Sequence, residues 1–157
     1  MKIITILSIV AAIFISSCSG SESEKKISLK TGKYGYVISD STGKSLIEGE
    51  MQINTITKQK DVGTENDYIV GGSYTITKNN ADTTYMGFST MNGGEMTGYY
   101  NEERKFININ TNPKIADANV FLNAFLKKGN LEGGWHYSTF RGTHNEGGLF
   151  KAERIKK

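Results

Sequence analysis

The chain has 157 residues, of which 37% are hydrophobic and 22% are charged, and this length suits one domain with a real core better than two. Its net charge of only +3 is too mild to indicate nucleic-acid binding, so we expect no nucleic-acid partner. A single cysteine excludes an intrachain disulfide, and 18 glycines beside one proline indicate many tight turns.

The start of the chain has the three parts of an export signal. Met1-Lys2 gives a basic start, residues 3–15 are almost entirely apolar, and the small-residue stretch "SSCSG" follows. The apolar run is shorter than the roughly 20 residues that a membrane-spanning helix needs. We therefore expect this segment to be removed rather than kept as an anchor.

The only cysteine lies in Ile15-Ser16-Ser17-Cys18, which resembles the lipobox of bacterial lipoproteins. The resemblance implies that residues 1–17 are a signal peptide, that cleavage follows Ser17, and that Cys18 carries a covalent lipid. It implies a protein anchored to the membrane of the cell envelope, and Ser19 in place of aspartate favours the outer membrane. We expect no other cofactor. The alternatives are a plain secreted protein whose cysteine lies near the cleavage site by accident, and a cytoplasmic protein.

The segment after the cysteine reads as a tether. Residues 18–31 lack a pattern that would bury one face, and as a flexible coil they would hold the domain roughly 20 Å from its lipid. The packed domain is therefore expected over residues 32–157.

From Gly32 onward, apolar residues alternate with polar ones, which predicts β-strands. In residues 68–77 one face carries aromatic and aliphatic side chains, and Gly72 interrupts that face where a curving sheet needs no side chain. Together with the ambiguous segment described below, the pattern predicts about nine strands. The other eight runs are 33–39, 44–56, 83–91, 95–101, 104–110, a strand from about Ala118, 131–139 and 147–155.

Short turn signals separate these runs. Asn92-Gly93 and Gly129-Asn130 are typical of two-residue hairpins, whereas residues 40–43 and 101–103 suit longer turns. Each run then pairs with the next in an antiparallel up-and-down meander.

Residues 113–128 fit two structures. Asn112, Pro113 and Gly129 lie where a helix would begin and end. Alternation of Val120 and every second residue after it indicates a strand instead, and we favour a strand from about Ala118.

We expect an all-β fold in which this meander closes into a small barrel or half-barrel, because closure removes exposed sheet edges. A two-sheet sandwich is the alternative. The stretch "LEGGWHYSTFRGTHNEGGLFKAERIKK" resembles the closing hairpin of small all-β bacterial envelope lipoproteins. That resemblance identifies no activity.

The sequence offers little catalytic chemistry. His136 and His144 are the only imidazoles, and His136 is expected on the face opposite Trp135. No spacing suggests a metal site, no Gly-x-Ser-x-Gly turn occurs, and the acidic pairs 48/50 and 102/103 suggest turns or outer faces. We therefore expect no enzyme activity, no catalytic residues and no metal.

Binding is the function that the composition leaves open. Four aromatic residues would either fill a barrel or line a pocket for a small apolar or sugar ligand: Tyr68, Tyr74, Trp135 and Tyr137. The loop at 140–146, with Arg141 and His144, is a second candidate surface. We expect a lipid-anchored module that binds a small ligand or an envelope protein. A structural or assembly lipoprotein without a pocket is the alternative, and an envelope hydrolase is the third.

Overall fold

A computed structural model describes residues 28–59, 67–140 and 146–156 of the chain. The predicted signal peptide, Cys18 and the loop residues Arg141 and His144 lie outside the described residues.

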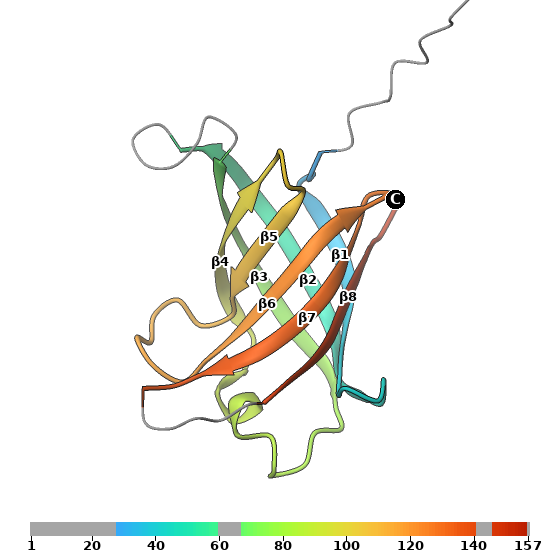
Figure 1. The fold of residues 1–157 in the computed structure, drawn as a ribbon, viewed down its shortest axis with the longest axis vertical. Helices are drawn as coiled ribbons and strands as arrows, with labels where there is room; N and C mark the ends of the chain where they lie inside the picture. Colours follow the sequence, from blue (N-terminus) through green and yellow to red (C-terminus); the bar gives the residue numbers. More distant parts are fainter. Residues whose placement is uncertain (1–27, 60–66, 141–145, 157) are drawn as a thin grey trace, which may run out of the picture.

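Within these residues, eight antiparallel strands form a closed barrel (Figure 1). Each strand pairs with the next one along the chain, and β8 pairs with β1, for example Tyr36 with Ala152. The predicted all-β meander and its closure are thus confirmed. The strands are β1 (Gly32–Ser39), β2 (Ser45–Lys58), β3 (Asp67–Asn79), β4 (Gly94–Asn101), β5 (Phe106–Asn110), β6 (Asn119–Lys127), β7 (Asn130–Ser138) and β8 (Gly147–Arg154).

The ninth predicted strand, at residues 83–91, is wrong. This segment is a turn followed by the 3₁₀ helix η1 (Met86–Thr90). Its apolar residues Tyr85, Phe88 and Met91 recur every third position, which is the period of a 3₁₀ helix and brings these side chains to one side. Phe88 and Met91 are consequently both buried against the end of the barrel.

Two hairpin predictions also change with the observed register. Asn92-Gly93 joins no hairpin, because no strand precedes it, and it leads directly into β4. Between β6 and β7 the positive φ angles belong to Lys128 (51°) and Gly129 (91°), one residue earlier than predicted. The reason is that Lys127 pairs with Asn130, so Asn130 is already part of the sheet.

The ambiguous segment is a strand from Asn119, as we favoured. Alternate residues of β6 are buried, namely Val120, Leu122, Ala124 and Leu126. A helix would scatter these side chains around its axis, whereas a strand directs all of them into the barrel.

Inward-facing glycines allow the sheet to curl. A Cβ atom built on Gly72 would lie 2.2 Å from the backbone oxygen of Gln52, so the predicted role of this glycine is confirmed. The same close approach to a carbonyl of a neighbouring strand recurs at Gly49, Gly98, Gly133 and Gly148. At these positions the neighbouring backbone occupies the place of a side chain, which permits a sharp bend.

Other residues cover the two ends of the barrel. At the end where β1 begins, Leu29 is buried in the core, so the packed domain includes a residue that the sequence analysis places in the tether. The hydroxyl of Tyr34 donates to the backbone oxygen of Lys30 at 2.8 Å and holds this segment in place. At the opposite end, η1 lies under the strands (Figure 1).

We predict that Gly133→Ala destabilises the protein by about 3 kcal/mol or more. Its Cβ would lie 2.0 Å from the backbone oxygen of Asn123, and relief of that clash requires the strands to separate. Gly35→Ala is the matched control, because nothing lies within 4 Å of its added Cβ. Its change should stay within about 0.5 kcal/mol. Urea unfolding measures the free energy of unfolding of both variants. Equal values for Gly133→Ala and Gly35→Ala would contradict the role given to the inward glycines.

Candidate functional site

The four aromatic residues proposed as pocket lining lie at different levels of the barrel. Tyr68 packs at 6.2 Å from Tyr100, near the turn between β4 and β5, and its hydroxyl donates to Glu102 at 3.2 Å. Tyr74 lies in the middle, edge-on to Tyr36 at 6.5 Å. Trp135 and Tyr137 lie at the other end, next to η1.

Trp135 is part of the packing that closes this lower end. Its indole nitrogen donates to the backbone oxygen of Ser39 at 2.8 Å, and the ring of Phe88 packs 4.6 Å from it. Gly87 of η1 lies directly against the Tyr137 ring, where a Cβ would come within 2.8 Å. These contacts favour a filling role for Trp135 and Tyr137 over a role in lining a ligand pocket.

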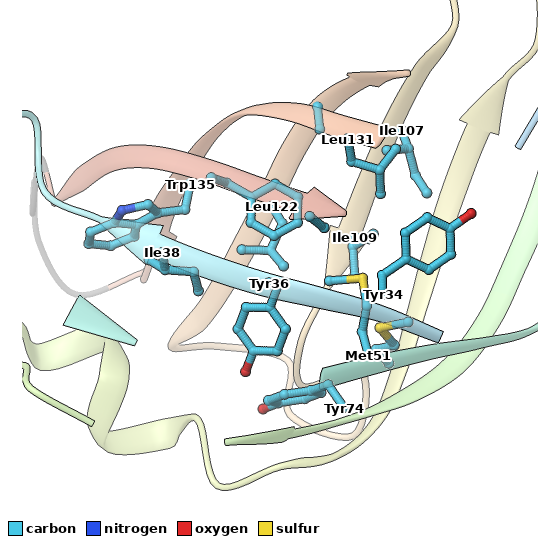
Figure 2. Packing of buried hydrophobic residues seen from close by; sticks show 14 of the residues in the cluster. Tyr34, Tyr36, Ile38, Met51, Tyr74, Ile107, Ile109, Leu122, Leu131 and Trp135 are labelled. Atoms are coloured by element: carbon cyan, nitrogen blue, oxygen red, sulfur yellow. The ribbon is translucent and has the colours of Figure 1, made fainter. Parts of the chain in front are cut away.

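The barrel interior is occupied by side chains (Figure 2). Tyr34, Tyr36 and Phe150 are almost completely inaccessible to solvent, and leucine, isoleucine and methionine side chains fill the space between them. An eight-stranded barrel is only wide enough to hold its own side chains or one small ligand. The observed packing corresponds to the first case.

A small polar recess opens beside Tyr74. Its volume is about 240 Å³, and residues from the start of β4 and from the loop after β5 line it. Glu95 and Lys114, both among the lining residues, form an exposed ion pair at 3.0 Å. An exposed pair of this kind contributes little stability.

Within the described residues, a group of outward-facing aromatic side chains lies on the outer wall of β5, β6 and β7. We call it the aromatic-amide platform, and it comprises Phe106, Asn108, Phe121, Asn123, Phe125 and His136. These residues alternate along their strands with buried ones, so all six side chains face outward.

A chain of hydrogen bonds crosses the three strands at the centre of the platform. Asn108 Nδ2 donates to Asn123 Oδ1 at 2.7 Å, and Asn123 Nδ2 lies 2.9 Å from His136 Nδ1. Because an amide N–H can only donate, His136 Nδ1 accepts, and the proton of the neutral ring lies on Nε2. The prediction that His136 faces away from the buried Trp135 is confirmed.

Aromatic rings flank this amide chain on both sides. Phe106 and Phe125 pack together at 5.3 Å, and Phe125 remains 50% exposed. On the other side Phe121 stacks on His136, with ring centroids 5.3 Å apart and planes 16° from parallel. The platform is therefore a fixed surface of rings and amides rather than a set of independent side chains.

The outer wall formed by β1, β2 and β3 differs from the platform. There, Lys33 pairs with Glu50 and Lys78 pairs with Glu48, both at 3.2 Å. The centre of the platform carries uncharged side chains, and the ion pair of this wall, Lys127 with Glu132, lies at its edge.

The sequence analysis does not predict the platform, although the sequence contains one signal for it. Phe106, Phe121 and Phe125 occupy outward positions at which a solvated strand normally carries polar residues. Recognising them as one surface requires the register that places Asn108 opposite Asn123 and Phe106 opposite Phe125.

Other kinds of site receive no support from the described part of the chain. Within those residues, no three histidine, cysteine, aspartate or glutamate side chains come together as metal ligands. The same residues include no helix long and apolar enough to cross a membrane.

Three comparisons with known proteins return no match. No protein-family model matches the chain, and no curated protein or solved structure does so either. Residue roles therefore follow from the geometry alone.

The buried tyrosines predict a loss of stability at alkaline pH. Burial raises the pKa of Tyr36, Tyr34 and Tyr74 above the ordinary value of 10.0. Between that value and the higher folded-state pKa, the unfolded chain releases phenolic protons that the folded barrel retains. The protonated buried tyrosines therefore contribute their full stability to the folded barrel below pH 10, and this contribution is lost as the pH rises above 10.

Phenolate absorbance and circular dichroism, followed together against pH, test this prediction. We expect the buried tyrosines to ionise only as the barrel unfolds, and Tyr36→Phe to move that transition to higher pH. The same variant loses the 3.2 Å hydrogen bond to the Thr75 backbone oxygen, at about 1 kcal/mol near neutral pH. Ionisation of every tyrosine near pH 10 in a folded barrel would contradict the burial.

Proposed function

We propose that the protein is a bacterial lipoprotein of the cell envelope that acts without catalysis, as a binding module. On this proposal Cys18 carries the lipid, the outer membrane holds it, and the aromatic-amide platform binds a component of the envelope. The proposed lipid anchor and membrane location rest on the lipobox resemblance of residues 15–18. The binding role rests on the outer wall of the barrel.

The observation that carries the binding role is the outward position of three aromatic rings around uncharged amide side chains. Phe125 is 50% exposed, and it lies with Phe106 and Phe121 around a chain of hydrogen-bonded amides. Soluble proteins seldom keep contiguous apolar surface in water unless it serves an interaction. The occupied interior supports the same conclusion, because it favours a partner outside the barrel over a small ligand within it.

The attachment geometry is compatible with this role. Leu29 enters the barrel at one end of its axis. Arg154 holds the segment between Leu29 and β1 by donating to the Thr31 backbone oxygen at 3.3 Å. The strands β5, β6 and β7, which carry the platform, form part of the side wall of the barrel (Figure 1), whereas Leu29 enters at its end.

The proposed anchor predicts a clear outcome for Cys18→Ala. This variant should incorporate no labelled fatty acid and should leave the membrane fraction, because burial of each acyl methylene contributes about 0.8 kcal/mol to membrane binding. Ser21→Ala serves as the control and should behave as the unmodified protein. Retention of label and of membrane association by Cys18→Ala would exclude the anchor.

The proposed binding surface predicts that the protein sediments with envelope fragments of the producing bacterium after detergent extraction. Phe121→Ser combined with Phe125→Ser should weaken this binding by about tenfold or more, since aromatic anchors dominate such contacts. Val37→Ser, which changes an exposed apolar residue on β1, is the matched control. Unchanged sedimentation of the double variant would place the binding surface elsewhere.

A further inference from the structure

Resting on the proposed function, we infer that the component bound by the aromatic-amide platform is an uncharged polysaccharide chain, laid flat across β5, β6 and β7. Three observations carry this inference: the lack of charge on the platform, its unused hydrogen-bond donors, and the spacing of its rings.

The centre of the platform is uncharged, and charged residues begin at its edge, where Glu132 lies opposite Phe125. Charged residues make up 22% of the chain, yet the six platform residues include none. At the edge of the platform Glu132 is already paired with Lys127 at 3.1 Å. A polyanion would find no free cation on this surface, and an uncharged ligand needs none.

The amide chain leaves donors that a partner must satisfy. Each of Asn108 and Asn123 uses one N–H of its side chain within the platform, so a second N–H remains on each, and His136 keeps the proton on Nε2. Within the described residues, no other hydrogen bond takes these three donors. A purely apolar partner would bury them unpaired, which is unfavourable. The hydroxyls of a sugar would accept from them.

The rings are spaced for an extended ligand. Phe121 and Phe125 are four residues apart on β6, so about 13 Å separates them along the strand. Asn123 lies between them on the same face. A sugar chain presents C–H faces and hydroxyl edges in alternation, which matches a surface of ring, amide and ring. A single sugar unit would not reach both rings.

Two other occupants agree less well with these residues. A lipid surface would leave the amides without partners. The lysine next to the rings, Lys127, is already paired with Glu132, and anionic lipids favour unpaired basic residues. A second copy of the chain would bring three donors against the same three donors. Among these side chains, the Asn108 amide oxygen is the one acceptor that the amide chain does not already use. Both remain outcomes of the experiment.

Affinity electrophoresis tests the inference with the purified lipidated protein in a detergent that contains no sugar. The gels contain soluble β-glucan, galactomannan or the polyanion alginate. We expect at least one neutral polymer to retard the protein and alginate to have no effect. Phe121→Ser with Phe125→Ser should weaken this binding by about tenfold or more, and Val37→Ser should not.

Asn123→Leu separates sugar binding from apolar docking. It removes the centre of the amide chain and adds apolar surface, so sugar binding should fall by about tenfold, whereas apolar docking would strengthen. Circular dichroism confirms that each variant is folded.

Four outcomes would overturn the inference. They are the absence of retardation by either neutral polymer, equal retardation by alginate, unchanged sugar binding in Asn123→Leu, and a dimer in sedimentation analysis that Phe125→Ser dissociates. If the protein binds envelope fragments through the platform but binds neither neutral polymer, the proposed function stands and the polysaccharide inference fails.

Discussion

The close approach of backbone strands at the inward glycines is the constraint on which the rest of the structure depends. At Gly49 and Gly133 a neighbouring carbonyl oxygen lies where any other residue would place its Cβ. The sheet can therefore bend sharply enough for β8 to pair with β1, which joins the first and last strands of the described sheet to each other. Closure also encloses the aromatic side chains, which then fill the interior.

A filled, closed barrel has only its ends and its outer wall available for recognition. One end is covered by η1, whose Phe88 packs on Trp135, and the other by Leu29. The outer wall has two kinds of surface, one with exposed ion pairs and one with phenylalanine rings. Exposed ion pairs such as Lys33 with Glu50 contribute little to stability but keep one surface solvated. The wall of β5, β6 and β7 keeps one such pair at its edge, Lys127 with Glu132. Phenylalanine rings occupy other outward positions around the amides, and half-exposed rings gain little from folding. Their presence there is better explained by an interaction than by the stability of the barrel.

The sequence predicts those features that depend on alternation within one strand. It does not predict features that depend on which residues of a neighbouring strand lie opposite. Alternation of Val120 with the residues after it identified β6 despite Pro113 and Asn112. The run at 83–91 resembles a strand in composition, but its apolar residues Tyr85, Phe88 and Met91 recur with a period of three, which is the period of a 3₁₀ helix. The platform was invisible for a different reason. Phe106 and Phe125 are distant in sequence, and only the pairing register makes them neighbours.

A lipid anchor and a shallow binding surface complement each other physically. A flat wall buries less of a ligand than a cleft does, and a polysaccharide with few fixed contacts would be held weakly by one platform. Attachment through a tether converts that encounter into a nearly intramolecular one, and effective concentrations for short flexible linkers reach the millimolar range. Weak contacts then suffice for occupancy while the protein can still move along the polymer. On the proposed function, the tether therefore contributes affinity that the platform alone does not supply.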